Sequence, residues 1–224
     1  MKNLIFLSCL LLGINTFAAQ SGLFMVVKGN VSIQRLDGKT EQAKLNSAVH
    51  PGETVTTEAD SKAKIVMTDR NIINVLPNTK VTIEKYTNEP SDKNVDIKLH
   101  SGKIRTDVVE KYDGKNNKFE IRTAVAAMGV RGTQLVVSHN TSTNTTEVVT
   151  LTVEVYVLRA AKLSGALGFG PKSELTVKTQ EMLQLQGDAK TAKVERMNAK
   201  AFEALKKETD VVNEIEKASS GVRN

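Results

Sequence analysis

The sequence predicts a mainly β protein, an antiparallel β-roll or sandwich of many short strands with a C-terminal α-helix. From about Val26 to Gln186, apolar and polar residues alternate, which is the pattern of strands that bury one face. From Ala189 to Lys217 the chain is rich in Ala, Lys and Glu, and its apolar residues recur at helical spacing. That spacing produces a helix with a single apolar stripe.

The alternation divides into short segments that turn residues separate. The clearest segment runs from Val149 to Val157 with an apolar residue at every second position, which predicts one strand with five residues on its buried face. The tract Asn140–Thr145 is polar throughout and predicts a hairpin tip, and the Gly-rich tract Lys162–Lys172 predicts a loop. The other alternating sets are Val31/Ile33, Ala63/Ile65/Met67, Val81/Ile83, Val95/Ile97/Leu99, Phe119/Ile121, Leu175/Val177 and Leu183/Leu185. The turn signals are Asp37-Gly38, Pro51-Gly52, Pro77-Asn78, Ser101-Gly102 and Asp113-Gly114.

The first 19 residues have the features of a secretory signal peptide. A positive start is followed by an apolar run over residues 4–14 and by small residues up to Ala18 and Ala19. The run is shorter than the roughly 20 residues that span a bilayer. We therefore expect cleavage after Ala18 or Ala19, no transmembrane segment in the mature chain, and export to the periplasm. Secretion beyond the outer membrane stays open.

Composition excludes several classes of partner and site. Cys9, the one cysteine of the chain, lies in the signal peptide, so the mature chain should form no disulfide and no thiolate metal site. The net charge is +6, but the lysines are spread along the chain, aromatic residues are only 4 % and Trp is absent. Binding of single-stranded nucleic acid uses aromatic platforms beside clustered basic residues, so we expect no nucleic-acid partner.

The C-terminal helix is expected over residues 189–217, after a β-domain over 20–188 and before a frayed tail over 218–224. Its apolar stripe includes Met197, Ala201, Leu205 and Val212. We expect this stripe to pack on the β-domain or to mediate self-association, because burial of such a face supplies most of a helix's stability. Binding to a membrane surface is disfavoured, since the stripe is thin and has one aromatic residue, Phe202.

Four stretches then occur in a fixed order. They are Gly29-Asn30-Val31 with Gly52 to Thr57, Ala63 to Asp69 with Leu76 to Ile83, Val95 to Leu99 with Gly102-Lys103-Ile104, and Phe119 to Thr123 with Gly129-Val130-Arg131-Gly132-Thr133. In this order and spacing they resemble the FecR domain family, over roughly residues 29–157. The Val-Arg-Gly-Thr element is the most specific of them.

The motif around Arg131 also has a physical interpretation. Gly129 and Gly132 allow a backbone conformation or a close approach that a Cβ atom would forbid. Arg131 could then bond strand carbonyls or a carboxylate through its five donors. We favour this structural role over ligand binding, and the second reading stays open. The chain has Asp69-Arg70-Asn71 where the family often has Asp-Gly-Ser, so we expect Asn71 to take the positive φ of that turn.

The resemblance implies a periplasmic domain that senses another envelope protein by contact. The regulators that give the family its name consist of a cytoplasmic anti-sigma segment, a membrane helix and then this domain. Only the last part is recognisable in this chain, which implies a stand-alone exported domain and does not carry over iron-citrate signalling.

No catalytic constellation is apparent. His50, His100 and His139 are widely separated and lie in no metal-binding frame, and no phosphate loop or serine-nucleophile motif occurs. We predict no catalytic residue, no metal and no cofactor. The expected function is a non-catalytic protein-interaction or scaffolding module in the envelope, with an envelope protein or a cell-wall polymer as partner. Two alternatives are a protein that binds peptidoglycan or surface polysaccharide, and a polysaccharide hydrolase, which would need two facing carboxylates.

Overall fold

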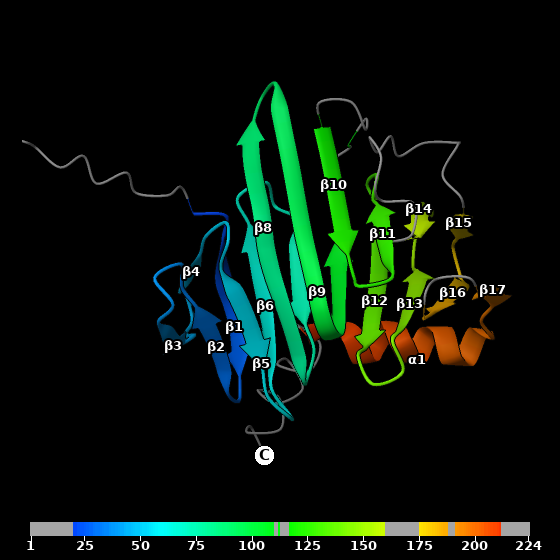
Figure 1. The fold of residues 1–224 in the computed structure, drawn as a ribbon, viewed down its shortest axis with the longest axis horizontal. Coiled ribbons are helices and arrows are strands. Elements are labelled where there is room, and N and C mark those ends of the chain that lie inside the picture. The colour runs from blue at the N-terminus through cyan, green and yellow to red at the C-terminus, as the bar shows by residue number, and fades with distance from the viewer. Residues whose placement is uncertain (1–19, 110–111, 113–116, 160–174, 188–190, 212–224) are drawn as a thin grey trace, which may run out of the picture.

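In the part of the chain that the structure describes, two β-sheets enclose an apolar core, and one helix lies on the outside of one sheet (Figure 1). The computed structural model describes residues 20–109, 112, 117–159, 175–187 and 191–211. The predicted signal peptide, with Ala18 and Ala19, lies outside the described residues. So do the Gly-rich tract within 160–174 and the predicted tail 218–224. Within the described part of the chain, no helix is long and apolar enough to cross a membrane.

The first sheet, sheet A, has the strand order β4-β1-β6-β7-β9-β12-β13-β16-β17. Its strands are β1 (Gly22–Lys28), β4 (Ala48–Val49), β6 (Lys62–Met67), β7 (Ile72–Val75), β9 (Asp92–Asp107), β12 (Gln134–Asn140), β13 (Thr145–Thr150), β16 (Glu181–Gln186) and β17 (Thr191–Arg196).

The second sheet, sheet B, has the order β3-β2-β5-β8-β9-β10-β11-β14-β15. Its additional strands are β2 (Val31–Gln34), β3 (Thr40–Gln42), β5 (Thr54–Thr57), β8 (Thr79–Glu89), β10 (Asn117–Arg122), β11 (Ala126–Gly129), β14 (Glu154–Arg159) and β15 (Leu175–Lys178). The pairing of β10 with β9 is parallel, whereas the other pairings among the described strands are antiparallel, in agreement with the predicted antiparallel β-roll or sandwich.

Strand β9 belongs to both sheets and turns the corner between them. Its first part pairs with β8 and β10, and from Gly102 onward it pairs with β12 and β7. Gly102 has φ 90°, a conformation that glycine adopts without a steric penalty. A bend of this kind is how one strand serves two packed sheets.

The core between the sheets includes residues that the alternation predicted, such as Ile33, Ile65 and Ile97, together with others that it did not, such as Phe24 and Ile73. Phe24, Ile65 and Ile73 of sheet A and Ile33 and Ile97 of sheet B are at most 1 % exposed. Burial of each such side chain contributes roughly 1.5–3 kcal/mol. The predicted mainly β fold with a C-terminal helix is therefore confirmed.

The predicted strand from Val149 to Val157 is wrong as a single element. It divides into β13 in sheet A and β14 in sheet B, with a turn between them in which Val153 has φ 58° and is 59 % exposed. Val149 lies on the outer face of sheet A, in the cluster with Phe202 of the helix, whereas Val155 of sheet B lies in the core between the sheets. Alternation indicates which positions of a strand are apolar, but it does not indicate which sheet or which face buries them.

The predicted helix over 189–217 is also corrected. Residues 191–196 form β17, which pairs with β16 at the edge of sheet A, and helix α1 spans Ala199–Thr209, while residues 212–217 of the prediction lie outside the described residues. The Asn198 side chain accepts a hydrogen bond from the Ala201 N–H and caps the helix N-terminus. The pairing with β16 supplies backbone hydrogen bonds that outweigh the helix propensity of this Lys- and Glu-containing segment.

Candidate binding site: a polar groove beside the helix

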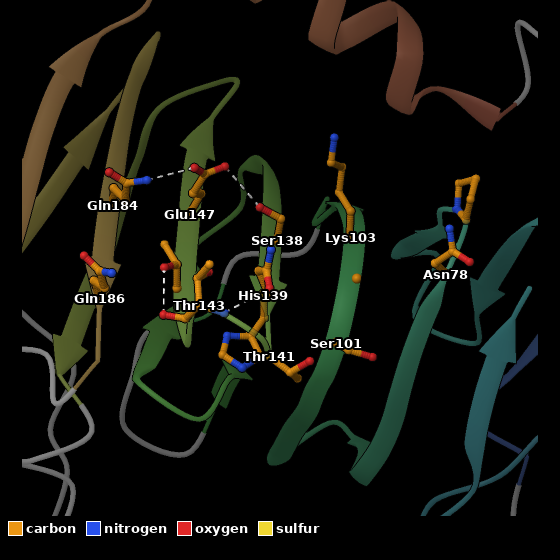
Figure 2. Close-up of a pocket in the computed structure, with 14 residues that line it drawn as sticks. Asn78, Ser101, Lys103, Ser138, His139, Thr141, Thr143, Glu147, Gln184 and Gln186 are labelled. Atoms are coloured by element: carbon orange, nitrogen blue, oxygen red, sulfur yellow. Dashed lines mark hydrogen bonds between the residues drawn. The ribbon is translucent and has the colours of Figure 1, made fainter. Parts of the chain in front are cut away.

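A groove of about 710 Å³ lies on the outer face of sheet A, beside α1 (Figure 2). Strands β9, β12, β13 and β16 form its floor. The turn at Pro77 and Asn78 lies along one side, and the β12–β13 hairpin tip closes one end. The remaining lining residues are Ser101, Gly102, Lys103, Ser138, His139, Asn140, Thr141, Thr143, Thr145, Glu147, Gln184 and Gln186.

The strand alternation explains why this face has two different halves. On β16, Leu183 and Leu185 point into the core, whereas Met182, Gln184 and Gln186 point outward. Met182 lies under the helix, and the two glutamines lie in the groove. Strands β12 and β13 repeat this arrangement, with apolar outward residues under α1 and polar ones beyond it. The outward-facing residues of these strands are thus apolar where the helix covers the sheet and polar where the groove leaves it open.

Cross-strand pairing arranges the polar side chains in two rows. The first row is Gln184, Glu147, Ser138 and Lys103, which are register neighbours across β16, β13, β12 and β9. The second row begins with Gln186, Thr145 and Asn140. Figure 2 shows the first row, from Gln184 through Glu147 and Ser138 to Lys103.

Hydrogen bonds hold the first row in place. The Gln184 side-chain amide donates to Glu147 Oε1 over 3.1 Å, and the Ser138 hydroxyl donates to Glu147 Oε2 over 3.4 Å. The hairpin tip is stabilised by Asn140, whose side-chain oxygen accepts from the backbone N–H groups of Ser142 and Thr143. The floor and one end of the groove are therefore ordered before any ligand arrives.

Basic residues of sheet A fasten the C-terminal end of α1 next to the groove. Arg105 donates to the Lys206 carbonyl over 3.1 Å, and Lys62 donates to the Glu208 carbonyl over 3.4 Å. Lys103 forms an ion pair with the Glu208 carboxylate at 3.1 Å. The last carbonyls of a helix have no intrahelical partners and carry partial negative charge, so cations stabilise them.

The apolar stripe of the helix faces sheet A. Phe202 is 7 % exposed and clusters with Val136, Val149 and Leu151, and Met197 and Leu205 pack against that cluster. Ala201 is partly buried on the same helix. Val212, the fourth predicted stripe residue, lies outside the described residues. The structure therefore brings Met197 and Leu205 together as packing residues, and a contact of the helix with a partner or a second copy stays a prediction.

The segment Gly129–Thr133 forms a corner between the sheets. It leads from β11 in sheet B to β12 in sheet A, and Gly132 takes φ 61°. Thr133 is buried and donates to the Thr152 carbonyl in the β13–β14 turn, where the chain returns to sheet B. The Thr152 hydroxyl in turn accepts from the Gln134 N–H over 2.9 Å. The two corners are thus bonded to each other.

Within that corner, Arg131 and Val130 point to opposite sides. Val130 is buried in the core, and its N–H donates to the Phe119 carbonyl over 2.9 Å. Arg131 is exposed, and its guanidinium lies 5.9 Å from the centre of the Tyr156 ring, a cation–π distance. Whether Arg131 has a structural or a ligand-binding role stays a prediction.

At the family's Asp-Gly-Ser position, Arg70 takes the positive φ of 66°, which corrects the expectation for Asn71. Asn71 is fully buried, and its side-chain oxygen accepts from the Val109 N–H over 2.9 Å. The turn thus places its long charged residue outside and its short amide in the interior.

The three histidines lie apart. His50 contacts Glu53 at 3.3 Å, His100 bonds the Thr82 hydroxyl at 2.8 Å, and His139 bonds the Thr146 hydroxyl at 2.9 Å. Burial lowers the pKa of His100 and of His139, which favours their neutral forms. Within the described ranges, no group of three His, Cys, Asp or Glu residues has the arrangement of a metal site.

Comparison with known proteins agrees with this geometry. Residues 53–155 match the family described as FecR protein, so the predicted resemblance to the FecR domain family is confirmed over this part of the chain. The match covers strands β5 to β13 and the start of β14, including both corners and most of the groove floor. No curated protein matches the sequence.

Two crystal structures have a similar fold. Both are of a candidate anti-sigma factor from Parabacteroides distasonis ATCC 8503, at 1.65 Å and 2.50 Å resolution, and each is 14 % identical to this chain. The TM-scores are 0.51 and 0.50, with 68 % and 66 % of this chain covered. The alignments span 63 % and 61 % of those proteins, which is less than two thirds of their length.

Proposed function

We propose that this protein is a non-catalytic FecR-domain module of the bacterial cell envelope, which acts in signalling by contact with another envelope protein. The observation that carries the proposal is the FecR domain over residues 53–155. The fold shared with a candidate anti-sigma factor supports a regulatory role. The signal-peptide pattern of residues 1–19 supports an exported location.

The corner at Arg131 is the surface that we assign to the protein contact. It presents an exposed arginine at cation–π distance from Tyr156, and arginine and tyrosine are enriched among the residues that dominate protein interfaces. Because Gly132 and Thr133 hold this corner in one conformation, the pair is presented with little entropy left to lose on binding.

In-cell crosslinking of the tagged full chain tests this function. A discrete envelope protein should be captured by the native chain, and Arg131→Ala should reduce its yield severalfold. Arg196→Ala, which removes an exposed arginine from the edge strand β17, is the matched control and should leave the yield unchanged. Equal capture by both variants would reject Arg131 as the contact. Failure of the native chain to capture any protein would reject the protein-contact function.

The groove favours a second candidate function, recognition of an envelope polymer. Its lining is polar along four strands, as a surface for a hydrophilic chain should be. It does not favour the hydrolase alternative, because Glu147 is the one carboxylate among the lining residues and hydrolysis of a glycosidic bond ordinarily uses two.

A further inference from the structure

We infer that the groove beside α1 binds an uncharged polysaccharide segment that carries N-acetylated sugars. The inference names the ligand class for the polymer-recognition candidate, and it rests on the proposal that the chain is a binding module of the envelope. Four properties of the lining support it: charge balance, hydrogen-bonding chemistry, the kinds of side chain that are absent, and a preorganised extended floor.

The lining is electrically balanced. Its charged side chains are Lys103 and Glu147. Lys103 is paired with Glu208 of α1, and Glu147 accepts hydrogen bonds from Gln184 and Ser138. An anionic polymer would meet no excess of positive charge in this lining, and a cationic one would meet a single carboxylate that is already engaged. The groove therefore suits a neutral ligand.

The other polar residues are hydroxyls and amides. Ser101, Thr141 and Thr145 supply hydroxyls, and Asn78 and Gln186 supply side-chain amides. Groups of both kinds donate and accept hydrogen bonds. A sugar hydroxyl also does both, and an acetamido group offers one N–H donor and one C=O acceptor. Such a lining can bond successive sugars without any charge on either side.

The same lining is poorly suited to a folded protein or an apolar peptide. Among the described residues, no Phe, Tyr, Trp or Arg lines the groove, and Pro77 is its largest apolar contributor. Protein interfaces obtain most of their binding energy from buried aromatic and arginine anchors. Because none is available in this lining, a polypeptide is the disfavoured occupant.

The floor is long and rigid enough for an extended chain. Four neighbouring strands, β9, β12, β13 and β16, lie side by side beneath it, which gives a width of about 14 Å at the usual strand spacing. The volume of about 710 Å³ falls in the range of roughly 300–1,000 Å³ of ligand sites. The hydrogen-bonded row from Gln184 to Ser138 reduces the ordering that a ligand must impose.

Titration of the tagged full chain with a hexamer of N-acetylglucosamine, followed by calorimetry and by NMR shifts of assigned amides, tests the inference. We expect binding with a dissociation constant on the order of 0.1–1 mM, since hydrogen bonds contribute little net energy and the lining offers no stacking ring. The amides that shift should be those of Ser101 to Lys103, Ser138 to Glu147, and Gln184 to Gln186. Cellohexaose, which has no acetamido groups, should bind at least severalfold more weakly.

Two double variants distinguish binding in the groove from binding elsewhere on the surface. Gln184→Ala with Gln186→Ala should weaken binding about tenfold, the loss expected for about two net hydrogen bonds. Gln34→Ala with Gln42→Ala removes two exposed glutamines from β2 and β3 of sheet B and should leave affinity unchanged. Thermal melts of both variants show whether the fold is retained.

The outcomes are distinct. Absence of binding, shifts confined to residues outside the groove, or equal affinities of the two double variants would each overturn the inference. If a neutral Gly-Ser peptide shifts the groove amides and the hexasaccharide does not, the ligand class is overturned and the groove remains a binding site. Sedimentation with isolated sacculi, compared with purified surface polysaccharide, identifies the source of the sugar. Protein capture that depends on Arg131 is measured separately, so the protein-contact function can fail or stand independently of this result.

Discussion

The hydroxyl of Tyr112 donates a hydrogen bond to Asp69 over 2.8 Å and joins the segment after β9 to the β6–β7 turn. Asn71 completes the connection, because its side-chain NH2 group donates to both Asp69 and the Tyr112 oxygen. All three side chains are at most 5 % exposed. A buried network of this kind is strong only while each member keeps its partners.

Replacement of Tyr112 by Phe should therefore destabilise the fold by about 1–3 kcal/mol, since Asp69 and Asn71 would each lose a buried partner. Urea unfolding measures the change. Tyr156→Phe is the control: its hydroxyl also donates to a carboxylate, that of Glu154, over 2.6 Å, but near the surface. We expect less than about 0.5 kcal/mol there. Equal effects of the two changes would show that the Tyr112 network contributes nothing beyond ordinary packing.

Alanine substitutions at Gly102 and Gly38 distinguish the effect of steric crowding from the effect of backbone strain. Both have positive φ, 90° and 84°, so a Cβ atom costs roughly 1–2 kcal/mol at either position. At Gly102 that atom would also lie 2.5 Å from the Asn78 carbonyl oxygen and 2.5 Å from Thr79 Cα, whereas at Gly38 nothing lies within 4 Å. Gly102→Ala should therefore cost about 1–3 kcal/mol more than Gly38→Ala. Similar melting temperatures for the two variants would contradict the tight corner in β9.

The tyrosines predict the alkaline limit of stability. Burial is the main reason that the pKa of Tyr86 is raised to about 12, and it also raises the pKa of Tyr112. The hydrogen bond to Glu154 raises the pKa of Tyr156. The folded state then keeps protons that the unfolded chain releases near pH 10, so stability falls as the pH rises from about 10 to 12. Because the chain has three tyrosines and no Trp, tyrosinate absorbance reports this directly. Normal titration near pH 10 in the folded protein would contradict the burial of Tyr86 and Tyr112.

Substitutions on the apolar stripe can be compared with substitutions at exposed positions of the helix, to test whether the stripe stabilises the fold. Met197→Asp with Leu205→Asp places two carboxylates against the cluster around Phe202, and we expect a loss of about 3 kcal/mol or more. Lys200→Asp with Ala204→Asp changes two exposed positions of α1 and should cost only about 1 kcal/mol through helix propensity. If the stripe variant keeps full stability and loses partner capture, the helix is a contact surface and not part of the packing.

Local pattern was sufficient for the mainly β class, for core residues such as Ile33, Ile65 and Ile97, and for the FecR resemblance. Burial on one face of a strand imposes alternation on neighbouring residues, and a conformation such as that of Gly102 demands a particular residue type. Both constraints act within a few positions of the chain, so they are visible in the sequence.

The candidate site was not visible in the same way. Ser138, Glu147 and Gln184 became one row only through strand pairing between distant segments, and no single segment marks them as neighbours. Each of them is a polar residue at an outward-facing, alternate position of its strand. That pattern was the available signal in the sequence, but many other surface residues share it.

Tertiary structure also decided where the chain changes sheets and where the helix begins. Val149 to Val157 alternates without interruption, yet Val153 is where the chain passes from sheet A to sheet B. Residues 191–196 resemble the helix that follows them, yet they complete the edge of sheet A. The sequence by itself determined the mainly β class, many of the buried strand residues and the resemblance to the FecR family. The three-dimensional packing decided which sheet buries them, because that choice depends on hydrogen bonds to strands far away in the chain.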